Sequence, residues 1–151
     1  MEASASPARV LVVANQTAAT PALIEAVRER AKASPATFTL LVPNPAHGLH
    51  RVVDPEDQDR SEGDEKLAEA LPLLQEAAGA PVEGMIGVSE PLAAIQDAIN
   101  IQGFDEIIIS MLPKRVSKWL KLDLPHKAAG LGLPVTAVTA ERVEHIATSA
   151  H

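Results

Sequence analysis

The 151-residue chain contains no cysteine, no tyrosine and only three aromatic residues, Phe38, Phe104 and Trp119. Without cysteine, disulfide bonds and thiolate chemistry are excluded. Few aromatic rings and a net charge of -7 argue against general nucleic-acid binding, which relies on broad basic surfaces and stacking rings. No apolar run approaches the roughly 20 residues that span a bilayer, and residues 1–7 lack the charged and apolar regions of a signal peptide. We therefore expect a cytoplasmic protein.

The composition is that of one soluble globular domain. Hydrophobic residues make up 46% of the chain and charged residues 22%, which is ordinary for such a protein. We expect a small, polar N-terminal arm over residues 1–8 to be disordered. The domain then covers residues 9–140, and residues 141–151 form a C-terminal tail that we expect to be less ordered.

Short apolar runs alternate with amphipathic segments along the chain. Buried strands are predicted where β-branched and apolar residues follow one another, at 9–14, 37–42, 82–86, 106–110 and 135–139. Capping residues and prolines at 20–21, 61–64 and 89–91 indicate the starts of helices between them. Continuously apolar strands are typical of a parallel sheet that is covered on both faces. The predicted fold is therefore α/β, a five-stranded, mainly parallel, doubly wound sheet (order 3-2-1-4-5) with helices on both faces.

A basic segment follows the apolar strand at 106–110. Residues 105–127 hold five of the chain's thirteen lysines and arginines, namely Lys114, Arg115, Lys118, Lys121 and Lys127. Open α/β sheets bind ligands at the carboxyl ends of their strands, so we expect a small anionic ligand here. The side chains of Lys114, Arg115 and His126 are the candidates for holding it.

The same basic segment has two other interpretations. Lys114, Lys118 and Lys121 recur at helical spacing, and the apolar residues Leu112, Val116, Trp119 and Leu120 fall on the opposite side. The bases are then the solvated face of a short helix whose Trp119 side packs on the core. A helix of this pattern also suits an acidic membrane surface or an acidic partner, although a short one binds weakly alone.

The order of these features resembles the universal stress protein family. The matching stretches are 10–17 for the first strand and its turn, Gly87 after the third strand, and 104–110 for the fourth strand. The resemblance covers Arg9 to Thr139. It implies a fold related to adenine-nucleotide-binding domains, a regulatory or stress-response role, and a homodimer that forms through the last strand, Val135 to Thr139.

The resemblance also implies where a ligand is held. Its positions are Asn15 and Thr17 after the first strand, Val42 at the end of the second strand, and Ser110 at the end of the fourth. Nucleotide-binding members carry Gly-x2-Gly-x9-Gly-Ser/Thr after the fourth strand. In this chain the motif falls on Ser110, Pro113, Asp123 and Leu124, so that every glycine and the final hydroxyl are replaced.

These replacements disfavour the family's mode of ATP binding. Glycines let backbone N–H groups approach a phosphate, whereas Pro113 has no N–H and Asp123 adds a negative charge. Near the end of the second strand, relatives use a backbone N–H to hold adenine; if that position falls on Pro43, which follows Val42, the donor is absent. We therefore expect no resident cofactor, and ATP or AMP are disfavoured candidates.

Catalytic and metal sites are not indicated. Ser110 has no identifiable base or oxyanion loop, so we do not expect an enzyme. His47 and His50 lie near Asp54, but a loop with two imidazoles and no second-shell partner is more often exposed than metal-bound. The acidic stretch from Asp54 to Glu65 is interpreted as a solvated loop.

Two functional hypotheses follow. In the first, the protein is a small-molecule binding module that senses a nucleotide or another small anion through Asn15, Thr17, Val42, Ser110, Lys114, Arg115 and His126. In the second, it is a dimeric interaction module or a transporter-accessory module that has lost ATP binding.

Overall fold

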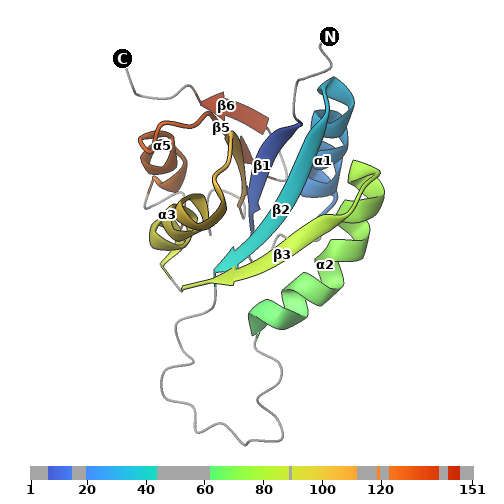
Figure 1. Ribbon diagram of the computed structural model, residues 1–151, viewed down its shortest axis with the longest axis horizontal. Helices are drawn as coiled ribbons and strands as arrows, with labels where there is room; N and C mark the ends of the chain where they lie inside the picture. Colours follow the sequence, from blue (N-terminus) through green and yellow to red (C-terminus); the bar gives the residue numbers. More distant parts are fainter. Residues whose placement is uncertain are drawn as a thin grey trace, which may run out of the picture.

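The computed structural model describes residues 7–14, 20–43, 62–88, 90–111, 119, 123–139 and 143–146 (Figure 1). Its elements, in chain order, are β1 (Ala8–Val13), α1 (Pro21–Ala33), β2 (Ala36–Pro43), α2 (Glu62–Ala78), β3 (Val82–Gly87), α3 (Pro91–Gln102), β4 (Glu106–Ser110), α5 (Leu124–Ala129), β5 (Val135–Val138) and β6 (Val143–Ile146). All five predicted strands are present, and their ends agree with the prediction to within one residue. The short helix predicted in the basic segment after the fourth strand lies outside the described residues apart from Trp119, which is helical.

The strands form one sheet in the order β3-β2-β1-β4-β5-β6. The first five strands of this order are parallel, with Val12 at the centre between Leu40 of β2 and Ile108 of β4. The predicted parallel sheet of order 3-2-1-4-5 is therefore confirmed. Because the first two crossovers step one way from β1 and the next two step the other way, the carboxyl ends of β1 and β4 lie side by side where the order reverses.

Two layers of helices cover the sheet (Figure 1). One core cluster lies on the face of α1 and α2 and includes Val10, Val12 and Leu23. The other lies on the face of α3 and α5 and includes Leu11, Val13 and Ile95. Successive residues of β1 thus enter opposite cores, as the pleat of a strand requires, and this explains why β1 is apolar without interruption.

Trp119 packs against the second of these clusters and is partly buried. This agrees with its predicted place on the apolar side of a helix that packs on the core.

The sixth strand corrects the prediction for the chain after β5. Residues 143–146 lie in the segment that was expected to be a less ordered tail, but they form β6, which pairs antiparallel with β5 from Val135↔Ile146 to Val138↔Val143. The hydroxyl of Thr136 also contacts Nδ1 of His145 at 3.0 Å. Val135 to Thr139 was expected to hold the last strand of the sheet; β6 follows it and occupies its outer edge. Pairing of two copies through Val135 to Thr139 stays a prediction.

The amino ends of the central strands are joined by ion pairs and hydrogen bonds. Arg30, in the last turn of α1, donates from Nε to Oε1 of Glu106 at 2.9 Å and from Nη2 to Oε2 at 2.8 Å. Both side chains are largely buried, with 17% and 25% exposed. The hydrogen bond to Glu106 raises the pKa of Arg30, which remains a cation. This bidentate ion pair fixes the end of α1 to the first residue of β4.

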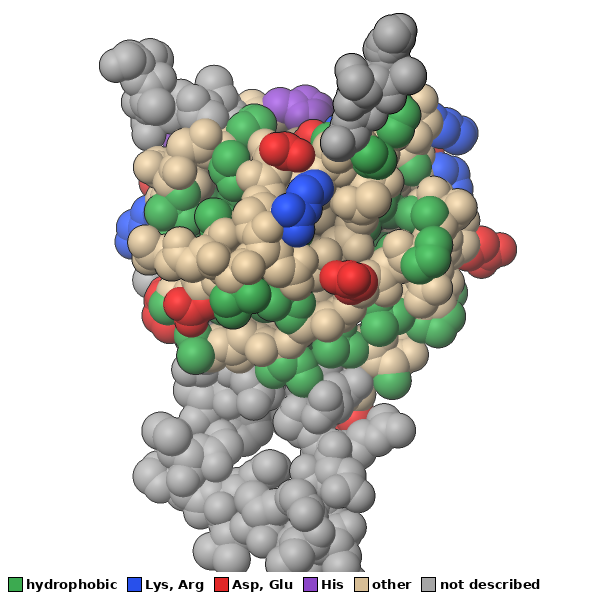
Figure 2. Space-filling view, in the orientation of Figure 1, with side chains coloured by type: hydrophobic (Ala, Val, Ile, Leu, Met, Phe, Trp, Pro, Cys, Tyr) green, Lys and Arg blue, Asp and Glu red, His purple; other side chains and the backbone are tan. Residues whose placement is uncertain are grey.

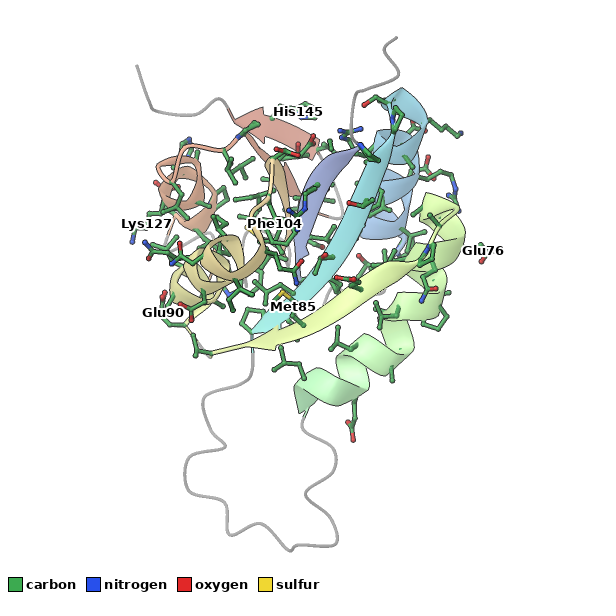
Figure 3. All side chains as sticks on the ribbon, viewed as in Figure 1. Glu76, Met85, Glu90, Phe104, Lys127 and His145 are labelled. Atoms are coloured by element: carbon green, nitrogen blue, oxygen red, sulfur yellow. The ribbon has the colours of Figure 1, made fainter. Side chains whose placement is uncertain are left out.

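A second link joins β1 to the start of β4. The backbone N–H of Arg9 donates to Oδ2 of Asp105 at 2.8 Å, and the N–H of Asp105 donates to the carbonyl of Arg9 at 2.8 Å. The Arg9 guanidinium lies 5.7 Å from the centre of the Phe104 ring, within range of a cation–π interaction. Figure 3 shows Phe104 between α3 and the strands at this end of the sheet.

No helix in the described ranges has both the length and the apolar character needed to cross a membrane.

Candidate functional site

The candidate site lies at the carboxyl edge of the sheet, where β1 and β4 end next to each other. At the end of β1, the N–H of Ala14 donates to the carbonyl of Leu41 at 3.1 Å. At the end of β4, the N–H of Met111 donates to the carbonyl of Val138 at 2.8 Å. Pairing therefore continues through Ala14 and Met111, and these strand ends lie where open α/β sheets bind ligands.

Ser110 is the last residue of β4 and pairs in register with Val138. It is on the same face of the sheet as Ile108, which packs in the cluster under α1 and α2. Its side chain is only 2% exposed. The structure thus brings Ser110 to the predicted edge but buries it, so it is better placed to shape the floor of a site than to offer an exposed hydroxyl.

Val42 is buried within the same cluster, with no exposed surface. The next residue, Pro43, is the last of β2 and lies opposite Gly87 of β3. Because proline has no N–H, position 43 offers a carbonyl but no backbone donor at this edge.

His126 lies in α5, and its ring Nδ1 is 2.8 Å from Oδ1 of Asp123. Both side chains are 63% exposed. The role of His126 as a ligand contact stays a prediction; its three-residue spacing from Asp123 places the imidazole against a carboxylate. The sequence carried a signal for this pair, because side chains three residues apart meet at the start of a helix.

Asp123 itself has an uncommon backbone conformation. It precedes α5 with φ of 58° and ψ of 42°, and among the described residues it is the one position other than glycine with positive φ. This left-handed region favours glycine, although aspartate and asparagine tolerate it better than most residues.

The close approach of α3 to the sheet depends on Gly87. A Cβ at this position would lie 2.7 Å from Cβ of Ala94 and 3.1 Å from Cδ1 of Leu41. The N-terminus of α3 is capped by Glu90, whose carboxylate accepts from the N–H groups of Leu92 at 3.3 Å and Ala93 at 2.7 Å. Figure 3 shows Glu90 at this helix start, near the tip of β3. Gly87 thus sets the spacing of the α3 layer beside the carboxyl edge.

The remaining predicted positions lie outside the described residues. These are Asn15 and Thr17 after β1, Lys114 and Arg115 after β4, and the pair His47 and His50. Among residues with described side chains, no group of three or more histidine, aspartate or glutamate residues could hold a metal ion.

Solved structures of similar architecture were found for nearly the whole chain. A universal stress protein from Archaeoglobus fulgidus superposes with a TM-score of 0.60 over 87% of this chain and 93% of that chain, at 21% sequence identity. A second universal stress protein, crystallised in complex with cAMP, superposes with a TM-score of 0.52 over 95% of this chain and 100% of that chain, at 17% identity. The chain has the universal stress protein fold. No protein-family model and no curated protein matches the sequence.

Within the universal stress protein fold, the backbone at Asp123 is informative. The third glycine of the nucleotide-binding motif falls on this position when the motif is laid on the sequence. Aspartate stands there in the left-handed conformation that glycine favours. The turn before α5 therefore combines a left-handed backbone at Asp123 with a carboxylate that contacts His126.

Proposed function

We propose that the protein is a small-molecule binding module with a regulatory or stress-response role, and that it takes a nucleotide or another small anion at the carboxyl edge. The observation that carries this proposal is the reversal of strand order between β1 and β4 in a fold shared with a cAMP-bound protein. Such a reversal leaves a crevice outside the strand ends, and this is where open α/β sheets bind their ligands.

Charge supports an anionic ligand at this edge. The sequence after β4 supplies Lys114, Arg115, Lys118 and Lys121 within eleven residues of Ser110. In a chain of net charge -7 this is a local concentration of positive charge. Ammonium groups and one guanidinium suit a phosphate or a carboxylate.

The Asp123 carboxylate favours a ligand of low negative charge over ATP. A polyphosphate near this side chain meets like-charge repulsion, and this repulsion grows with the charge on the ligand. A cyclic nucleotide carries less negative charge than ATP and suffers less. We therefore expect cAMP or a similar monoanion to bind more tightly than ATP.

Thermal-shift and calorimetric titrations with cAMP, AMP, ADP, ATP and inorganic phosphate test this proposal. A ligand that binds the folded state stabilises it by about 2.7 kcal/mol at a hundredfold excess over its Kd. We expect cAMP to raise the unfolding midpoint more than ATP does. Asp123→Asn keeps the size of the side chain and its tolerance of the left-handed region. It is expected to bring the unfolding midpoints measured with cAMP and with ATP closer together.

A matched pair of double variants locates the site. Lys114→Ala with Arg115→Ala is expected to weaken cAMP binding about tenfold, which corresponds to about 1.4 kcal/mol. Arg28→Ala with Lys32→Ala removes the same charge from α1 and is expected to leave binding unchanged. Equal losses in both pairs would mean that net charge, and not this site, controls binding.

The second candidate function is an interaction module that has lost its ligand, including a transporter-accessory role. Its specific support is the pair of replacements at Asp123 and Pro43, which bring a carboxylate and a missing N–H to the carboxyl edge. This alternative predicts that none of the five compounds changes the unfolding midpoint.

A further inference from the structure

The outer side of β3 is a strand edge that has no neighbouring strand among the described residues. β3 ends the sheet at the side opposite β6, and in the described part of the chain no strand pairs with its outer side. Natural edge strands are commonly blunted by lysine, proline or a bulge. β3 contains neither lysine nor proline, and its register with β2 runs from Val82 to Gly87 without interruption. Its outward backbone groups are therefore arranged to accept another strand.

Apolar side chains are exposed at this edge. Ile86 is 36% exposed and Val88, just beyond the strand, is 51% exposed. Figure 2 shows hydrophobic side chains over the whole described face, including its lower part, where Figure 1 places β3. Because side chains alternate along a strand, Ile86 and Val88 face the α2 side of the sheet, while Glu83 and Met85 face the α3 side.

The stretch of sequence that contains α2, β3 and most of α3 is acidic. From residue 62 to residue 97 the sequence holds one base, Lys66, and eight acids: Glu62, Asp64, Glu65, Glu69, Glu76, Glu83, Glu90 and Asp97. Glu83 lies on β3 itself and is exposed, as is Glu76 on α2. Figure 3 shows Glu76 directed outward from α2, and Glu90 near the tip of β3. A second copy of this edge meets like charge, whereas a cationic strand meets opposite charge.

We propose that the outer edge of β3 binds an extended segment of a partner protein in which apolar residues alternate with lysine or arginine. The segment adds a strand to the sheet, so that backbone hydrogen bonds supply affinity and the alternating side chains supply selectivity. Its apolar residues lie beside Ile86 and Val88 on the α2 side, and its cations lie beside Glu83 on the α3 side. This surface is distinct from the carboxyl-edge ligand site between β1 and β4.

The probe is a fluorescein-labelled peptide of about eight residues in which valine alternates with lysine, long enough to span β3. Binding is measured by fluorescence anisotropy, and the contact residues are located by amide chemical shifts of the isotope-labelled protein. We expect shifts over residues 82–88 and none over 143–146. Binding is expected to weaken as salt rises from about 0.05 to 0.5 M, because the exposed charges are screened.

Two control peptides separate charge from strand pairing. Replacing each lysine by glutamate keeps the alternation but reverses the charge, and this peptide is expected not to bind. Methylating alternate backbone nitrogens keeps the side chains and the charge but removes the donors, so this peptide is expected to bind at least about tenfold more weakly. If the methylated peptide binds as well as the parent, strand addition is wrong.

Matched variants at β3 and β6, the two outermost strands of the sheet, complete the test. Val88 near β3 and Val143 on β6 are both 51% exposed, so a lysine at either position remains solvated. Val88→Lys and Glu83→Lys are each expected to weaken the parent peptide about tenfold, and Val143→Lys is expected to leave it unchanged. Absence of binding to the parent protein, or shifts at β6 instead of β3, would overturn the proposal. So would a protein dimer in sedimentation that Val88→Lys dissociates, because the occupant would then be a second copy.

Discussion

The amino and carboxyl ends of the strands, here the amino edge and the carboxyl edge of the sheet, use their polar side chains differently. At the amino edge, Arg30 and Asp105 bind partners far away in the sequence, and these contacts join α1 and β1 to the start of β4. At the carboxyl edge, Ser110 is buried, and His126 pairs with Asp123, which is only three positions away. The first arrangement holds elements together. The second leaves the architecture to backbone pairing and close packing, so that side chains at this edge can change without loss of the fold.

The largest expected effect comes from breaking the close packing at the carboxyl edge. Gly87→Ala places a Cβ 2.7 Å from Cβ of Ala94, a short side chain on the helix α3 that cannot rotate away. We expect the free energy of unfolding to fall by about 2 kcal/mol, measured by chemical denaturation.

Gly84→Ala is the matched control on the same strand. Its Cβ would meet the ends of the Leu67 and Leu71 side chains at 3.0 and 3.2 Å, and these ends can move. The loss is expected to stay below about 1 kcal/mol. Equal losses at both glycines would show that Gly87 does not set the position of α3.

The next largest loss of stability is expected from removing the ion pair of Arg30 and Glu106 at the amino edge. Arg30→Met keeps much of the side-chain volume but leaves the Glu106 carboxylate, 25% exposed, without its guanidinium partner. We expect the free energy of unfolding to fall by about 1 to 2 kcal/mol. Arg28→Met, in the same helix, removes only an exposed pair with Glu25 and is expected to change stability little.

The pH dependence of the Arg30 effect follows from its pKa. The folded-state pKa of Arg30 is raised. The contribution of its ion pair to stability is therefore fully present below the unfolded-state pKa, and it is lost only as pH rises through the folded-state pKa. Both values lie far above neutrality. The difference between the parent protein and Arg30→Met is therefore expected to be the same at pH 7 and pH 10, and a smaller difference at pH 10 would contradict a permanently charged pair.

A smaller loss of stability is expected from Arg9→Gln, which is also at the amino edge. This change removes the cation that lies over Phe104 but keeps the backbone N–H that donates to Asp105. The expected loss is about 0.5 to 1 kcal/mol, measured by thermal unfolding. A loss as large as that of Arg30→Met would show that the Arg9 side chain has a further role in joining β1 to β4.

The smallest expected effect is a gain in stability at the carboxyl edge. Asp123→Gly relieves the left-handed backbone, with φ of 58°, and gives up only an exposed contact with His126. We expect stability to rise by about 0.5 kcal/mol. Asp123→Ala removes the same carboxylate without relieving the backbone, and it is expected to be less stable than the glycine variant.

Sequence patterns predicted the sheet well because its strands are short apolar runs between clear turn signals. They missed β6, since Val143–Ile146 includes two polar residues and owes its state to pairing with β5. They also missed the pair of Arg30 and Glu106, whose residues are 76 positions apart and meet only in the folded chain. At the site, the position of Ser110 was predictable from the end of an apolar run, but its burial was not, because burial depends on the helices packed around it.

The central place of β1 has a consequence for the order of folding. β1 leaves the ribosome first, yet one of its two neighbours, β4, follows much later: Arg9 and Asp105 are 96 positions apart. Pairing of such distant segments is slow, because the intervening chain must first lose much of its conformational freedom. During synthesis the backbone edge of β1 that pairs with β4, and the apolar side chains of β1 that face α3 and α5, stay uncovered until these later elements have emerged, so chaperones have a long opportunity to bind at this strand.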